Sequence, residues 1–106
     1  MTTELIYRIP PYRFESMPMR RSELGDSIDW GLAAQGVPSA WEVSKGKGIL
    51  VGIIDTGAAK HADLPTPAFA HNFSTSRFTY DRGGHSTHIA GIIGGRVDGR
   101  GIVGVA

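Results

Sequence analysis

The stretch GILVGIIDTG at residues 48–57 decides the fold that the sequence predicts. Five of its first seven residues are Ile, Leu or Val, which is typical of a strand buried on both faces of a parallel sheet. Asp55 follows this run directly, and Thr56 and Gly57 begin a tight turn. Catalytic groups collect at the carboxyl ends of parallel strands, but Asp-Thr-Gly is also ordinary turn chemistry. The stretch alone leaves both roles open for Asp55.

The composition limits the classes of protein to consider. With 106 residues the chain is long enough for one small domain and too short for two. Eleven basic and ten acidic residues give a net charge of +1, too weak a field to favour binding to nucleic acid or to a membrane surface, and we expect neither partner. The absence of Cys excludes a disulfide framework, a thiolate metal site and a cysteine nucleophile.

Targeting signals are not visible in the sequence. The first twenty residues contain no apolar run of the length found in a secretory signal, and no run approaches the length of a membrane span. We therefore expect a cytoplasmic protein, although a processed chain would look the same.

A helix is predicted at residues 85–95, with the sequence HSTHIAGIIGG, because its isoleucines recur on one face at a period of 3.6 residues. Gly94 and Gly95 are expected to end it. Residues 102–106 then begin another apolar strand.

The remaining segments give weaker signals. Pro38 at a first-turn position predicts a short helix that packs Trp41 and Val43. A short strand is expected around residues 69–73, and another within residues 5–9, whereas Pro18, Arg20 and Arg21 are typical of a linker.

Asp55 and His85 together suggest chemistry. His85 opens the predicted helix behind a Gly-Gly pair, where its ring can face the end of the predicted strand. A carboxylate that accepts from one imidazole nitrogen fixes the tautomer, and the other nitrogen can then take a proton from a nucleophile. The pair therefore predicts the orienting half of a nucleophilic triad.

Four motifs in order, VGIIDTG, HADL, GGHSTHIAGIIGG and GIVGVA, resemble the Asp and His regions of the subtilisin-like serine peptidases (peptidase S8 type). The triad of that family runs in the order Asp, His, Ser. The resemblance covers residues from about 26 to 106 and implies an α/β fold with a parallel β-sheet and flanking helices. It makes Asp55 the orienting acid, His85 the general base and His88 a structural member of the motif, in an endopeptidase that acts on polypeptides.

The sequence departs from the family pattern in two places. Ser86 stands where the family has glycine, and we interpret it as a helix cap, the alternative being a side chain that obstructs the substrate. The nucleophile of the family lies in a Gly-Thr-Ser-Met-Ala segment that this chain does not contain. Residues 25–106 are therefore expected to be the N-terminal part of a truncated catalytic domain. This part would be inactive alone, have an unpaired sheet edge and need the remainder that carries the Ser as its partner.

A structural calcium site is also implied by the resemblance. The matching positions are Asp26, Asp63 and Asp98, with backbone oxygen atoms of residues 96–101 completing the ligand set. Without the family, three aspartates in loops are more often solvated or capping. His61 is expected to support the structure.

Residues 1–24 are predicted to be an N-terminal extension. Within it, RIPPYRF at residues 8–14 resembles the short Ile-Pro-Tyr-type segment by which intracellular subtilisins block their own cleft. Pro10 and Pro11 would hold the segment extended, which lowers the entropy cost of occupying a groove, and Tyr12 would join them there. The alternative is a disordered tail.

Two other functions remain as alternatives. A retroviral-type aspartic peptidase would use Asp55 in a homodimer, but fifty-four residues precede this Asp and the GGHSTHIAG motif has no role there. A non-catalytic remnant or interaction module is the other. Hydrolysis that is active in acid and insensitive to serine-directed reagents would favour the aspartic peptidase. A natural stop codon after residue 106 would favour the non-catalytic module.

Overall fold

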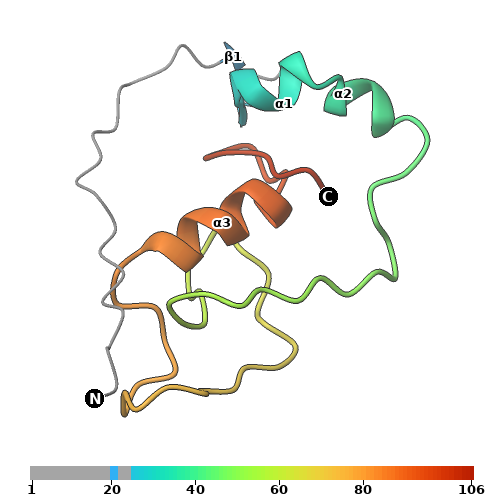
Figure 1. The fold of residues 1–106 in the computed structure, drawn as a ribbon. Helices are drawn as coiled ribbons and strands as arrows, with labels where there is room; N and C mark the ends of the chain where they lie inside the picture. The colour runs from blue at the N-terminus through green and yellow to red at the C-terminus, as the bar shows by residue number, and fades with distance from the viewer. Residues whose placement is uncertain (1–19, 22–24) are drawn as a thin grey trace, which may run out of the picture.

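The computed structural model describes residues 20–21 and 25–106 (Figure 1). The predicted strand at residues 5–9 and the segment 8–14 lie outside the described residues. The Cα radius of gyration is 16.3 Å, whereas a compact domain of 100 residues has about 13 Å. The structure is therefore less compact than a typical domain of this length. The elements are β1 (Arg20–Arg21), β2 (Ser27–Ile28), α1 (Trp30–Ala34), α2 (Val37–Ala40) and α3 (His85–Gly94).

Strands β1 and β2 pair in an antiparallel ladder, with Arg20 opposite Ile28 and Arg21 opposite Ser27. The linker prediction for Arg20 and Arg21 is therefore wrong, because their backbone has a partner that the local sequence does not reveal. On its other side, Ser27 forms an isolated parallel bridge with Ile102.

Helices α1 and α2 follow β2 directly. Asp29 caps α1 by accepting a hydrogen bond from Gly31 N at 3.2 Å. Helix α2 has Pro38 in its first turn as predicted, but it ends at Ala40, and Val43 is exposed instead of packed. Trp41 is held by a hydrogen bond from its Nε1 to the Val105 carbonyl oxygen at 2.7 Å.

The prediction of helix α3 is confirmed within one residue, with Gly95 as its C-cap. The segment 102–106 is not a strand but lies across the C-terminal end of this helix (Figure 1). The amides of Val105 and Ala106 donate to the carbonyl oxygens of Ile92 and Ile93 at 2.9 and 2.8 Å. The last turn of a helix leaves such carbonyl groups without partners, and the segment supplies the missing donors.

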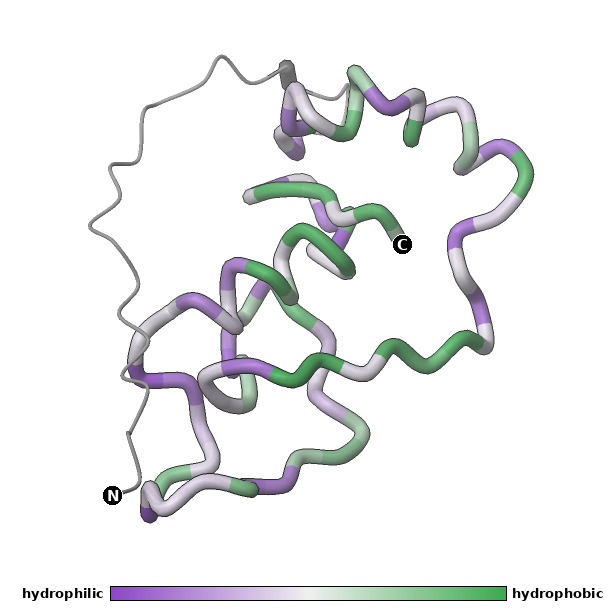
Figure 2. Tube along the Cα trace, viewed as in Figure 1, coloured by the Kyte–Doolittle hydropathy of each residue, from purple (hydrophilic) through white to green (hydrophobic). Residues whose placement is uncertain are grey.

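The strand predicted at residues 49–54 is not formed. This hydrophobic run lies along an open arc of the chain (Figure 2), with Leu50 88% and Ile54 103% exposed. The run has no backbone ladder with any part of the chain that the structure describes. A strand with this composition is stable only between neighbouring strands, and none is in place.

The parallel sheet of the predicted α/β fold is therefore not seen in the described residues, where parallel pairing is limited to two isolated bridges. The strand expected at residues 69–73 is also absent, and Phe69 and Phe73 are exposed. No helix within residues 25–106 is long and apolar enough to cross a bilayer. Within residues 25–106, the buried hydrophobic side chains are Leu32, Ala59, Leu64 and Val103.

Candidate active site

The turn after Asp55 is fixed by a close approach of two backbone segments. Ala58 N donates to Thr79 O at 2.7 Å, and Asp81 N donates to Ala58 O at 3.0 Å. Gly57 has a φ of 147°, and a Cβ atom at this position would lie 2.6 Å from the Tyr80 carbonyl carbon. The close contact leaves room only for glycine.

The structure brings Asp55 and His85 into direct contact. His85 Nδ1 lies 2.9 Å from each carboxylate oxygen of Asp55. An ionised carboxylate can only accept, so Nδ1 carries the proton and Nε2 of the neutral ring is left as an acceptor. The Asp55 side chain is 13% exposed and that of His85 is 52% exposed. The carboxylate is thus covered while the ring can be reached from solvent.

Two hydrogen bonds keep Asp55 ionised. Thr56 N donates to its Oδ1 at 2.6 Å, and this bond, followed by the one from His85, lowers the pKa of the Asp55 carboxyl below its ordinary value. A hydrogen bond to the charged form of an acid stabilises that form. Asp55 therefore stays an acceptor for His85 at neutral pH and below.

Ser86 does not cap helix α3, and that prediction is wrong. The N-cap is Gly84 in the left-handed region, with no side-chain cap bond. The free amides of the first turn find partners elsewhere, because Ser86 N donates to Thr56 Oγ1 at 3.2 Å and Thr87 N donates to Asp81 Oδ2 at 2.7 Å. Ser86 itself is buried, with 3% exposed, so it does not stand on the open face beside His85.

Asp81 is a site residue that the sequence reasoning missed. Partial burial of the Asp81 carboxyl would raise its pKa, but hydrogen bonds from Thr87, Thr56 and Gly84 outweigh burial and hold the pKa far below the ordinary value. The available signal was an acidic residue just before a helix, where a negative charge is favourable.

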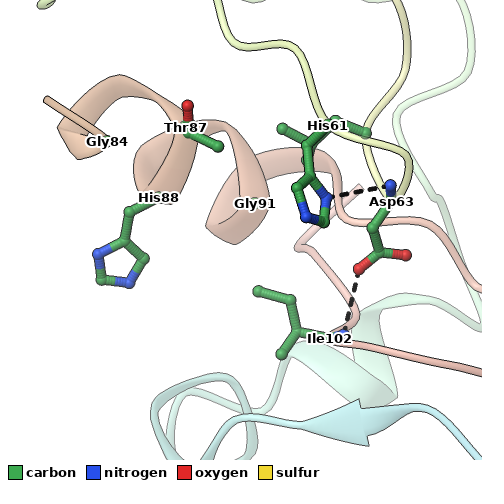
Figure 3. A pocket seen from close by; sticks show the side chains of 8 residues that line it. His61, Asp63, Gly84, Thr87, His88, Gly91 and Ile102 are labelled. Atoms are coloured by element: carbon green, nitrogen blue, oxygen red, sulfur yellow. Dashed lines mark hydrogen bonds between the residues drawn. The ribbon is translucent and has the colours of Figure 1, made fainter. Parts of the chain in front are cut away.

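A pocket of about 280 Å³ lies beside α3, with His61, Asp63 and His88 among its lining residues (Figure 3). His61 Nδ1 accepts a hydrogen bond from Asp63 N at 3.1 Å, which fits the supporting role predicted for His61. Asp63 Oδ2 accepts from Ile102 N at 3.3 Å, while Asp63 Oδ1 is buried without a partner.

Asp26 holds the loop at residues 96–101 through backbone amides. Its carboxylate is fully buried and accepts from the amides of Asp98, Gly99 and Arg100 at 3.1 to 3.2 Å. Asp98 faces Arg100, with Oδ2 3.5 Å from Nε. The carboxylates of Asp26 and Asp98 are therefore already engaged.

These positions test how well the three aspartates fit calcium. Calcium takes six to eight oxygen ligands, but of the three only Asp63 keeps a buried oxygen without a donor. No group of three or more His, Asp or Glu side chains in the described part of the chain is arranged to hold a metal ion. The three carboxylates as they lie do not form a shared site, and calcium stays a prediction.

Comparison with known proteins was made for sequence and for structure. The model of the family described as "Subtilase family" matches residues 46–106. No solved structure matches the chain.

Three curated relatives illustrate the similarity. Fervidolysin of Fervidobacterium pennivorans is 41% identical over 93 residues, which cover 79% of this chain and 13% of that protein. Minor extracellular protease Epr of Bacillus subtilis (strain 168) is 40% identical over 81 residues, which cover 73% of this chain and 12% of that protein. An alkaline protease of Alkalihalobacillus alcalophilus is 33% identical over 84 residues, which cover 78% of this chain and 22% of that protein. The chain thus spans a small part of the length of each relative.

Proposed function

Because the chain belongs to the subtilase family of peptidases, we propose that it is the Asp- and His-bearing part of a serine endopeptidase. Asp55 is the orienting acid and His85 the general base. The observation that carries this proposal is the contact of His85 Nδ1 with both Asp55 oxygen atoms at 2.9 Å.

In this mechanism the serine comes from the remainder of the catalytic domain. His85 Nε2 takes the proton of the serine hydroxyl as the oxygen attacks the scissile carbonyl of a polypeptide. It then returns this proton to the leaving amine. Asp55 remains ionised throughout and stabilises the imidazolium that forms between the two steps.

The geometry disfavours an aspartic peptidase. Two carboxylates that share a proton must lie side by side. Both oxygen atoms of Asp55 instead lie 2.9 Å from His85 Nδ1. A second carboxylate would have to displace the His85 ring.

We expect the complete gene product that contains these 106 residues to hydrolyse a peptide substrate at neutral pH, and the isolated chain to show no turnover. The reason is that, within the described residues, the His85 ring is hydrogen-bonded to Asp55 and to no serine hydroxyl. The measurement is release of a chromogenic group, with a serine-directed organophosphorus reagent and an aspartic-peptidase inhibitor as parallel treatments. Turnover by the isolated chain, or inhibition only by the second compound, would contradict the proposal.

We also propose a structural calcium ion near Asp63, whose Oδ1 is buried without a donor. The melting temperature of the complete product should rise by several degrees with calcium and not with an equal amount of magnesium, because a ligand that binds only the folded state stabilises it. Asp63→Asn should remove this rise, whereas Asp29→Asn, at the N-cap of α1, should keep it. Equal melting temperatures in calcium and in chelator would disprove the ion.

Two further proposals rest on sequence alone. The first is that residues 8–14 inhibit the cleft and that the chain is related to the intracellular subtilisins. This segment lies outside the described residues. A cytoplasmic location also stays a prediction, and the name of the relative Epr, an extracellular protease, does not favour it.

A further inference from the structure

The carboxylate of Asp81 lies where three parts of the candidate site meet. Its Oδ1 accepts from the Thr56 hydroxyl at 2.9 Å and from the amides of Gly83 and Gly84 at 3.1 and 3.0 Å. Thr56 directly follows Asp55, and Gly84 directly precedes His85. One oxygen atom therefore joins the turn that carries the acid to the loop that leads to the base.

The second oxygen of Asp81 fixes the first turn of helix α3. Its Oδ2 accepts from the amide and the hydroxyl of Thr87 at 2.7 and 2.6 Å. The Thr56 hydroxyl, which donates to Asp81, accepts in turn from Ser86 N at 3.2 Å. The residues on both sides of His85 are thus tied to one carboxylate.

The position of the His85 ring depends on this network. The ring is half exposed, and its side-chain hydrogen-bond partner is Asp55, so packing alone does not hold it. The N-cap Gly84 contributes no side chain to the helix start. A carboxylate at the helix N-terminus satisfies free amides and is also favoured by the helix dipole.

We propose that Asp81 is a positioning residue of the peptidase site, which sets the Asp55–His85 contact through Thr56 and Thr87. Asp81 has no contact with the reacting atoms in this role. The proposal rests on the proposed peptidase function for its kinetic consequence, while the position of the ring can be observed independently.

The test compares Asp81→Ala and Asp81→Asn with Asp29→Ala in the complete gene product. Asp29 is a matched control, because it is a carboxylate that caps another helix, α1. We expect Asp81→Ala to lower kcat by about 10- to 100-fold, because a misplacement of the catalytic groups by about 1 Å has an effect of this size. KM should change by less than about twofold. Asp81→Asn keeps one acceptor oxygen and should lie between this variant and the parent. Asp29→Ala should keep the kcat of the parent.

A second measurement reports the ring directly. The Nδ1 proton of a histidine bonded to a carboxylate gives a separate downfield proton resonance, which should be present in the parent and in Asp29→Ala and lost in Asp81→Ala. The fold-loss in kcat of the double variant Thr56→Val/Asp81→Ala should be smaller than the product of the fold-losses of the two single variants. The reason is that both changes break the same network.

Each outcome decides the proposal. If the parent hydrolyses peptide and Asp81→Ala behaves like Asp29→Ala, Asp81 has no positioning role. If the parent has no activity, the peptidase function fails, and the resonance alone decides: its loss in Asp81→Ala supports the role, and its persistence overturns it. If Asp81→Ala does not fold, the same readings apply to Asp81→Asn.

Discussion

The variant His85→Ala of the complete gene product is expected to hydrolyse peptides with a kcat lowered by about 10⁶-fold, the loss typical of removing the base from a Ser-His-Asp triad. Alanine removes Nε2, the only atom in this arrangement that can take the proton of the serine. KM should change little, since the ring acts on the proton and not on substrate binding. The measurement is steady-state hydrolysis of a peptide at neutral pH.

The variant Asp55→Asn extends this prediction to the acid. An amide in the place of the carboxylate can donate to Nδ1, and the ring then carries its proton on Nε2, where a base is needed. The expected loss in kcat is about 10⁴-fold, smaller than for His85→Ala because the ring is still present.

The pH dependence follows from the lowered pKa of Asp55. A lowered pKa means that the contribution of Asp55 to stability is present above the pKa of the unfolded chain and is lost as pH falls through the lower folded value. The contribution of Asp55 to the free energy of unfolding should therefore persist in mild acid, which urea denaturation at a series of pH values measures.

His71→Ala is the matched control for these variants. His71 is exposed and stacks beside Phe69 at a centroid distance of 6.3 Å, fourteen positions before His85 in the sequence. This variant should retain the kcat of the parent within about twofold. The assignment of the base is wrong if His85→Ala keeps more than about one part in a hundred of the parent rate, because a true base contributes far more.

Helix α3 could be predicted because its signal is local, and the Asp–His pair because its ordered motifs resemble those of a known family. The isoleucine period and the two closing glycines define α3 within one residue. The contact of Asp55 with His85 follows from ordered motifs whose spacing brings a turn to the start of a helix.

The features that sequence reasoning missed depend on partners distant in the sequence. Residues 49–54 have strand composition, but a strand forms only where neighbouring strands pair with it, and the described residues contain none beside it. Similarly, the sequence does not reveal that Asp26 accepts from backbone amides more than seventy residues away. Backbone donors carry no residue type, so a sequence pattern cannot assign them to a given carboxylate.

The other large effect is expected from Gly57→Ala. The added methyl group would lie 2.6 to 2.7 Å from backbone atoms of Tyr80 and Asp81, and neither segment can move without breaking the hydrogen bonds that join Ala58 to Thr79 and Asp81. The φ of 147° at Gly57 adds strain for any residue with a side chain. Together these effects should lower the free energy of unfolding by about 2 to 4 kcal/mol.

Gly52→Ala is the control, because it adds the same methyl group five residues earlier. A Cβ atom at Gly52 meets no heavy atom within 4 Å, and the residue has no positive φ, so its free energy of unfolding should change by less than about 0.5 kcal/mol. Urea denaturation of the 106-residue chain measures the stability of both variants, and kcat/KM of the complete product with Gly57→Ala, compared with the parent, reports the site. Because the crossing of residues 57–58 with 79–81 holds both Asp55 and Asp81, Gly57→Ala should also lose activity. Equal stability of the two alanine variants, together with parent activity for Gly57→Ala, would show that this crossing does not hold the acid in place.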